Sequence, residues 1–298
     1  MKQLSSHRYR CVLVLIFVVF NILPICSQTV TARYQVAACD WMMLKRQKLG
    51  EFKLAHELGA DGVEVDMGGL GKRVLFDNQL REPQQAEKFQ AAARQYGVAV
   101  PSMAMSGFFA QSFLTRDNYQ DLLKDCFQTM KLFGSKVAFL PLGGSGKDWQ
   151  QEGCAAYQQM VSRLRTAGEM AKQEGITIGI RTGMDAKFDK KLLKKVGSSQ
   201  IKVYYNFQDA ADHHRDIYKE LRKLGARRIV QIHASNTDSV NLQEDPEINL
   251  PKIRKTLDKM GWSGWLVVER SRDVKRVRDV KYNFGRNIAY LKQVFQER

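Results

Sequence analysis

The sequence contains few cysteines, and their spacing excludes the covalent frameworks on which many small exported proteins depend. Five cysteines occur in 298 residues, and two of them, Cys11 and Cys26, fall in the N-terminal segment discussed below. The other three are far apart, at positions 39, 126 and 154. This spacing predicts neither a disulfide framework nor a CxxC metal site. One opportunistic disulfide stays open for a protein in an oxidising compartment.

Acidic residues are scarce relative to basic ones. The chain has 31 acids and 47 bases, so its net charge is +16; residues 1–27 hold three of the bases and no acid, which leaves +13 for the rest. A strongly basic chain is soluble and attracts anionic ligands, but its charge does not predict a fold. The basic runs at 190–195 and 270–281 are expected to be solvated faces.

No uninterrupted apolar run reaches the roughly 20 residues that a membrane-spanning helix needs. The apolar segment Cys11–Leu23 follows three bases and precedes Pro24–Ser27, which resembles a cleavage region. This arrangement predicts a signal peptide over residues 1–27 and a mature chain, 28–298, that is exported to the periplasm or secreted. An uncleaved N-terminal anchor is the alternative, and a lipoprotein acylated at Cys26 is the second choice for an exported protein.

Residues 28–298 repeat one pattern eight times, in which a strand-like apolar segment precedes an amphipathic segment that usually ends at glycine. The expected strands are residues 34–38, 62–66, 98–103, 137–140, 176–180, 201–205, 229–232 and 265–268. The expected helices are residues 51–58, 83–96, 118–133, 157–173, 187–196, 216–224, 250–260 and 283–295. Eight such units in about 250 residues predict an α/β fold, a (β/α)8 TIM barrel in one domain. A doubly wound open sheet is the alternative.

Side chains at the carboxyl ends of parallel strands meet at one face of the fold. The clearest case is the apolar run Trp265–Val268, which stops at Glu269 and Arg270. Together the strand ends predict a mouth that contains Asp40, Trp41, Glu64, Asp66, residues 103–109, the loop at 143–144, Arg181, Asn206, Asp209, His233, Glu269 and Arg270. This mixture of carboxylates, imidazole and guanidinium predicts a pocket with a function.

Two weaker signals lie close to these strand ends. Lys72 belongs to the glycine-rich loop 68–73, in which backbone N–H groups and a lysine can hold an anion, although a flexible loop is the simpler interpretation. Four aromatic residues are candidates for a wall against which a sugar stacks, namely Trp41, Phe108, Phe109 and Trp149.

The strand layout and the segments IKVYYN, IVQIHASNTD and WLVVERSRD resemble the sugar phosphate isomerase/epimerase family, whose barrel is xylose isomerase-like. The resemblance implies a divalent ion held by Glu, Asp, His and Glu from strands five to eight. His233 and Glu269 match two of these ligands, but Arg181 and Asn206 stand at the other two. Because Mg²⁺ and Mn²⁺ prefer carboxylate oxygens and a guanidinium repels them, we expect weak or absent binding of Mg²⁺, Mn²⁺ or Zn²⁺.

These residues allow a chemistry without a metal ion. Arg181 can supply the positive charge that polarises a substrate oxygen or grips an anionic group, with Glu269 or Glu64 as the base and His233 as an acid or electrophile. Substrate binding is predicted for Asn206, Trp41, Asp66, Arg270 and Lys72. The predicted activity is proton transfer next to the carbonyl of a carbohydrate or keto-sugar, as in an isomerase, an epimerase or a dehydratase. A degenerate barrel that binds a carbohydrate without turnover is the alternative.

The predicted partner is a small carbohydrate, and export argues against a phosphorylated cytoplasmic metabolite. Nucleic acid is not expected, because endonuclease IV, which shares this barrel, needs a histidine-rich zinc cluster. Beyond residues 1–27 the chain has only four histidines, at positions 56, 213, 214 and 233. No membrane contact is expected beyond the signal peptide or a lipid anchor, and the oligomeric state is left open.

Overall fold

The structure is a computed structural model that describes residues 33–143 and 147–297. The described residues belong to one compact unit. The predicted signal peptide and the predicted start of the mature chain at residue 28 lie outside them. No helix within these two ranges is long and apolar enough to cross a membrane.

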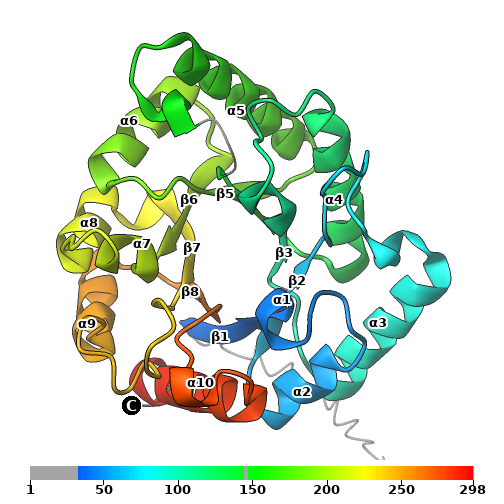
Figure 1. Cartoon of the computed structure of the whole chain (residues 1–298), viewed down its shortest axis with the longest axis vertical. Coiled ribbons are helices and arrows are strands. Elements are labelled where there is room, and N and C mark those ends of the chain that lie inside the picture. Colours follow the sequence, from blue (N-terminus) through cyan, green and yellow to red (C-terminus); the bar gives the residue numbers. More distant parts are fainter. Residues whose placement is uncertain (1–32, 144–146, 298) are drawn as a thin grey trace, which may run out of the picture. The chain divides into compact units, whose positions relative to one another are not determined.

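Eight parallel strands form a closed barrel in the order β1 to β8, and helices surround it (Figure 1). The strands are β1 (Tyr34–Cys39), β2 (Gly62–Asp66), β3 (Ser102–Ala104), β4 (Val137–Pro141), β5 (Thr177–Arg181), β6 (Ile201–Asn206), β7 (Ile229–His233) and β8 (Gly264–Val268). β8 pairs with β1 from Gly264–Tyr34 to Val268–Ala38, which closes the ring. The predicted TIM barrel is confirmed, and the open sheet is excluded.

The expected bounds of the third strand were wrong. The prediction was 98–103, whereas β3 covers Ser102–Ala104 and the preceding segment makes only one bridge, between Ala99 and Gly62. Pro101 explains the late start, because proline has no backbone N–H to donate to a sheet ladder. Val98 and Val100 are nevertheless buried, which is why the segment looks like a strand in the sequence.

The described chain contains ten α-helices, nine of which lie between successive strands and one of which, α10, follows β8. They are α1 (Asp40–Met43), α2 (Glu51–Glu57), α3 (Pro83–Tyr96), α4 (Tyr119–Phe133), α5 (Ala155–Gln173), α6 (Ala186–Val196), α7 (Phe207–Ala211), α8 (Ile217–Leu224), α9 (Leu250–Met260) and α10 (Val280–Phe295). The eight predicted helices are present, with ends that differ by up to three residues. Gly97 and Gly134 end α3 and α4 with φ of 63° and 68°, a conformation that glycine adopts without strain. The one-turn helices α1 and α7 were not predicted.

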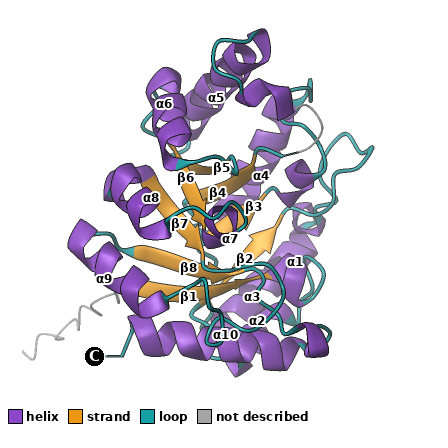
Figure 2. Ribbon diagram, turned by 60° about the vertical axis from the view of Figure 1, so that its left-hand side comes forward, coloured by secondary structure: helices purple, strands orange, loops and turns teal. Residues whose placement is uncertain are grey.

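The strands separate two cores of very different character. Figure 2 shows helices around the sheet, and the outward-facing strand residues pack against them in a large apolar core. Inward-facing residues form a small apolar cluster of Ala37, Cys39, Ala104, Phe139, Tyr204 and Val267. Four buried polar residues, Glu64, Ser102, Gln231 and His233, lie on the same inward faces of their strands. The barrel interior is therefore unusually polar, and its charges need partners there.

The three cysteines of the described residues are free. Cys39 and Cys126 are fully buried, and burial raises the pKa of both thiols well above the ordinary value. The disulfide that the sequence left open is not formed.

Candidate active site

Glu269 is the first residue after β8 and stands at the centre of the barrel mouth. It is 4% exposed. The hydroxyl of Ser235 accepts hydrogen bonds from the backbone N–H groups of Glu269 (2.7 Å) and Arg270 (3.0 Å), which fixes the strand end. A carboxylate buried to this extent needs compensating donors.

Three side chains from the preceding three strands converge on one oxygen of Glu269. Its Oε2 lies 3.4 Å from Nη1 of Arg181, 3.3 Å from Nδ2 of Asn206 and 3.6 Å from Nδ1 of His233. The other oxygen, Oε1, makes no described hydrogen bond and is accessible to solvent. Glu269 is thus held through one oxygen and presents the other to the mouth.

Arg181 is held by a bidentate ion pair with Asp209. Nε donates to Oδ2 at 2.9 Å and Nη2 donates to Oδ1 at 2.7 Å, while the guanidinium lies 5.4 Å from the centre of the Phe109 ring. Burial acts against the charge, but Glu269 and Asp209 outweigh it and raise the pKa of Arg181 above its ordinary value. The guanidinium therefore stays charged, and Nη1 is the nitrogen left to face the mouth.

His233 connects the mouth to the polar interior of the barrel. Its Nε2 lies 2.8 Å from Oε1 of Glu64, and the hydroxyls of Ser102 (2.6 Å) and Tyr204 (2.7 Å) donate to the other oxygen of Glu64. Because a carboxylate only accepts, this network assigns the proton to Nε2. Nδ1 is then free to accept, and it has no hydrogen-bond partner within the described residues.

Tyr204 and Gln231 complete this network, and neither residue was predicted from the strand ends. Gln231 donates to the hydroxyls of Ser102 and Tyr204, each at 2.8 Å. Burial and the charge of Glu64 raise the pKa of Tyr204 well above its ordinary value, so its hydroxyl remains a donor. The signal was present in the sequence, since Tyr204 and Gln231 lie two residues before Asn206 and His233 and therefore on the same strand face.

Aromatic rings line part of the mouth, but not all of those predicted. Trp41 is half-buried, stacks on Phe139 at 6.4 Å and meets the ring of His233 edge-on at 5.9 Å. Phe109 is 38% exposed and covers Arg181. Two of the predicted aromatic residues, Phe108 and Trp149, are instead buried and pack against neighbouring aromatic rings.

The structure does not bring every predicted residue to the centre of the mouth. Glu64 is fully buried beneath His233, a position that favours a supporting role over that of a base in contact with substrate. Asp66 is also fully buried, accepts from the N–H groups of Gly68 (2.7 Å) and Ser106 (3.2 Å), and burial raises its pKa to about 6. Its contacts hold loops together, which argues against its predicted place in substrate binding.

Arg270 and Lys72 do not lie at the centre of the mouth. Arg270 pairs with Asp238 at 3.1 Å. Lys72 is exposed and makes no described side-chain hydrogen bond. The charges of these two bases are therefore not part of the group around Glu269.

These side chains do not fit a bound divalent metal ion. Around Oε2 of Glu269 they offer an imidazole, an amide and a guanidinium, and no group of three His, Cys, Asp or Glu in the described ranges is arranged to hold a metal. A dication about 4 Å from the Arg181 charge would meet a repulsion of about 8 kcal/mol at an effective dielectric constant of about 20. The site is therefore built around a protein cation.

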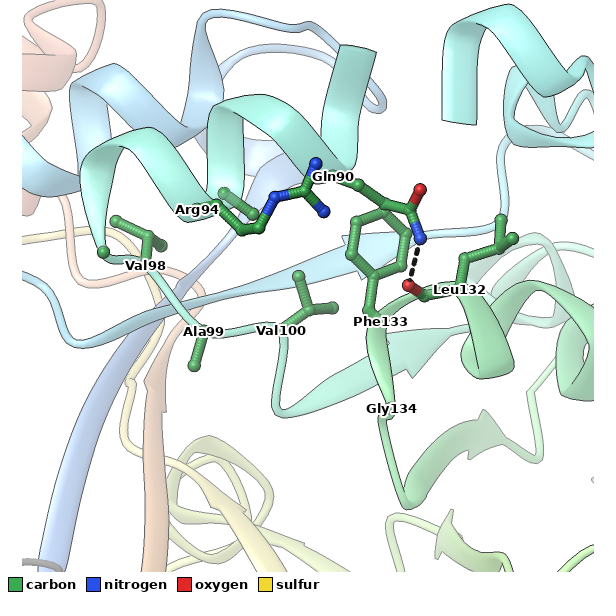
Figure 3. A pocket seen from close by; sticks show the side chains of 10 residues that line it. Gln90, Arg94, Val98, Ala99, Val100, Leu132, Phe133 and Gly134 are labelled. Carbon is green, nitrogen blue, oxygen red and sulfur yellow. Dashed lines mark hydrogen bonds between the residues drawn. The ribbon is translucent and has the colours of Figure 1, made fainter. Parts of the chain in front are cut away.

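A surface groove of about 580 Å³ lies away from this site. It is lined by the C-terminal turns of α3 and α4 and by residues 98–100, and Gln90 donates to the carbonyl of Leu132 across it at 2.5 Å (Figure 3). These residues precede β3 and β4 in the chain, so the groove is at the amino ends of the strands. Ligand sites of TIM-barrel enzymes lie at the opposite ends.

Comparison with known proteins identifies relatives that process sugars. A family model described as the xylose isomerase-like TIM barrel matches residues 52–294. Inosose dehydratase of Mesomycoplasma hyopneumoniae (strain 7448) is 23% identical over 267 residues, which covers 73% of this chain and 88% of the relative. At this identity its activity is not transferred by similarity alone.

Solved structures share the fold at lower identity. D-psicose 3-epimerase with D-tagatose from Clostridium cellulolyticum H10 superimposes with a TM-score of 0.66 at 12% identity, covering 88% of this chain and 99% of that one. 3-Keto-D-glucoside 4-epimerase from E. coli gives 0.67 at 13% identity, with 87% and 99% covered. The probable 3-DHS dehydratase of Bacillus anthracis gives 0.68 at 14% identity, with 87% and 98% covered. These likenesses show the fold.

A buried acid of α6, Asp189, predicts a pH-dependent stability. Asp189 accepts from the Thr182 hydroxyl at 2.6 Å, and burial raises its pKa from 3.8 to about 8. The folded protein therefore keeps a proton that the unfolded chain releases, and this contribution to stability is lost as pH rises from about 4 to about 8. We expect the free energy of unfolding of Asp189→Asn, measured in urea, to increase relative to that of the wild type as pH rises through this range. The increase should be up to about 1.4 kcal/mol per pH unit.

The matched control is Glu169→Gln, which removes an exposed acid of α5. Its stability relative to the wild type should stay constant with pH. A difference between Asp189→Asn and the wild type that also stays constant between pH 5 and 7 would contradict the buried, protonated state of Asp189.

The unsuitability of the site for a metal ion predicts the outcome of a titration. Measured by calorimetry, the Kd of the wild-type protein for Mn²⁺ at the mouth should be about 1 mM or higher. Arg181→Glu combined with Asn206→Asp replaces a cation and an amide by carboxylates and should bind Mn²⁺ at least about tenfold more tightly. Arg181→Gln is the control, because it removes the cation without adding a ligand oxygen of full charge. One tightly bound Mn²⁺ per wild-type chain that Glu269→Gln abolishes would refute the assignment.

Proposed function

The chain belongs to the family of xylose isomerase-like TIM barrels, and on that premise we propose that it moves a proton next to the carbonyl of a carbohydrate or keto-sugar. The observation that carries the proposal is the convergence of Arg181, Asn206 and His233 on one oxygen of Glu269. The sugar-processing activities of similar proteins support the substrate class. The reaction type is that of an isomerase, an epimerase or a dehydratase.

Glu269 is the proposed base. Oε2 is fixed by donors, and Oε1 faces the mouth, so the carboxylate is oriented toward a ligand before the ligand arrives. A positioned carboxylate that removes a proton in the transition state typically accelerates a reaction about 10²- to 10⁴-fold. The proton leaves the carbon next to the substrate carbonyl and passes to Glu269.

Arg181 and Asn206 stabilise the charge that develops on the substrate oxygen. When a proton leaves the neighbouring carbon, the carbonyl oxygen gains negative charge, and donors aimed at that oxygen lower the barrier. Asp209 holds Nε and Nη2 of Arg181, which leaves Nη1 as the oriented cationic donor. Arg181, which would repel a metal ion, thus supplies the positive charge that a metal ion would otherwise provide.

His233 supports the base from below. Glu64 binds Nε2, and Nδ1 lies 3.6 Å from Oε2 of Glu269. Once Glu269 is protonated, its carboxyl group has an acceptor in Nδ1, and Glu64 balances the imidazolium charge if the proton moves on. The rings of Trp41 and Phe109 offer apolar faces for the C–H side of a sugar.

The alternative function is carbohydrate binding without turnover. It is favoured by the same ion pair, because Arg181 engages the carboxylate that must act as the base. The two functions share a binding site and differ in one measurable property, which is the exchange of a carbon-bound proton with solvent.

Substitution of Glu269 separates the two functions. A panel of keto-sugars is incubated with the wild type in D2O, and deuterium incorporation next to the carbonyl is followed by NMR. Glu269→Gln should reduce incorporation at least about 10²-fold while changing the Kd of the sugar less than about threefold. Equal incorporation by wild type and variant would contradict the assignment of Glu269 as the base. If the wild type bound a keto-sugar without exchanging its protons, the function would be carbohydrate binding without turnover.

Arg181→Met tests the second proposed role in the same assay. It should weaken both sugar binding and exchange by at least about tenfold, because a charged hydrogen bond contributes about 1.5–3 kcal/mol. Arg165→Met is the control, since that guanidinium binds the backbone carbonyls of Lys195 and Val196 outside the barrel. Similar effects of the two variants would contradict a direct role for Arg181.

We further propose that the protein works outside the cytoplasm, in the periplasm or as a secreted protein. Support comes from the three bases, the apolar segment Cys11–Leu23 and the region Pro24–Ser27 in the sequence. Mass spectrometry of the protein from fractionated cells should find a mature N-terminus at residue 28, or an acylated Cys26. An intact N-terminus on cytoplasmic protein would contradict export.

A further inference from the structure

A basic cleft lies outside the barrel, at the end opposite to the candidate active site. Its volume is about 710 Å³, and it is formed by the second half of α6, the turn that follows and the first residues of β6, with η4 (Ala226–Arg228) on the other side. In Figure 2, α6 lies beside the strands β5 and β6. Lys202 is the second residue of β6 and Asn206 is its last, so the two are about 13 Å apart at 3.3 Å per residue. The cleft and the mouth are therefore separate.

Five cationic side chains line the cleft, and its lining contains no carboxylate. They are Lys190, Lys194, Lys202, Arg227 and Arg228. None of the five forms a salt bridge with a described residue, whereas Lys191, the neighbour of Lys190 on another face of α6, pairs with Glu152 at 2.8 Å. Charge of one sign is thus concentrated in the cleft and left uncompensated there.

The fold accounts for only part of this charge. Lys194 is in the last turn of α6, where a cation favours the helix dipole. Lys202 and Arg227 lie on β6 and η4, to which that argument does not apply. Like charges that face one concavity repel one another, so their gathering favours an anionic ligand.

The remaining lining residues narrow the class of ligand. Ser198, Ser199 and Gln200 place hydroxyl and amide groups between the cations, and Leu193 and Ile201 form the apolar part. The lining has no aromatic side chain on which nucleic-acid bases could stack. The large exposed apolar side chains of the described chain, such as Val74 and Val274, lie in other loops, so no apolar anchor for a bilayer accompanies the cleft.

We propose that this cleft binds an acidic polysaccharide. Lysine and arginine pair with carboxylates or sulfates of the chain, and the serine and glutamine groups bind its hydroxyls. A volume of about 710 Å³ is within the range of about 300–1,000 Å³ that is typical of ligand-binding pockets. Because the mouth is at the other end of the barrel, a bound polymer leaves it open to small sugars.

The test uses polygalacturonate, a carboxylated polysaccharide, with dextran as the uncharged polymer. The wild type should bind polygalacturonate and not dextran, and binding should weaken at least about tenfold between 50 and 300 mM NaCl, because salt screens charge pairs. Lys194→Gln, Lys202→Gln and Arg227→Gln together should raise the Kd for polygalacturonate at least about tenfold. Thermal unfolding of each protein verifies that the variants are folded.

The matched control removes the same charge elsewhere. Lys88→Gln, Lys259→Gln and Lys275→Gln alter exposed lysines on α3, α9 and η5 (Val274–Arg276) and should change the Kd less than about threefold. Equal losses in the two triple variants would show that net charge alone attracts the polymer and would overturn the proposal. So would absence of binding by the wild type, or tighter binding of single-stranded DNA or of anionic lipid vesicles. The readout does not involve turnover, so this site and the proposed activity stand or fall separately.

Discussion

The negative charge of Glu269, nearly buried at the barrel mouth, is the constraint from which the arrangement around it follows. An isolated carboxylate in such a place is costly unless donors and opposite charges replace the water that it has lost. Arg181 and Asn206 do this from two neighbouring strands, and Asp209 in turn fixes Arg181. Parallel strands make the arrangement available, because their carboxyl ends all open on the same side.

The same pairings account for the absence of suitable metal ligands in this group. A dication and a guanidinium compete for the same carboxylate oxygen, and the ion pair of Arg181 with Asp209 keeps the guanidinium in place at 2.7–2.9 Å. In the proposed mechanism, Arg181 supplies the positive charge that the family resemblance assigned to a metal ion. Below it, Glu64 and His233 extend the polar network into the barrel interior, where apolar packing would otherwise be expected.

Local sequence predicts the barrel well, because each strand is an apolar run with a polar residue at its end. One error has a local cause, since Pro101 delays β3 although the valines around it look like a strand. The other failures arise where the decisive partner is remote. Tyr204 and Glu64 are 140 residues apart and meet only inside the closed barrel. Asp66, Lys72 and Arg270 also follow strands, but they do not join the group around Glu269. Asp66 is buried, Lys72 is exposed, and Arg270 pairs with Asp238, and local sequence shows none of these surroundings.

A crystal structure of the wild-type protein with a bound keto-sugar would show whether Arg181 and Glu269 act on the substrate. We expect the sugar carbonyl oxygen at hydrogen-bonding distance, about 2.7–3.2 Å, from Nη1 of Arg181, with the adjacent C–H facing Oε1 of Glu269. We also expect that no metal ion lies between the sugar and His233. A sugar coordinated by a metal at Glu269, with Arg181 turned away, would contradict the proposed mechanism.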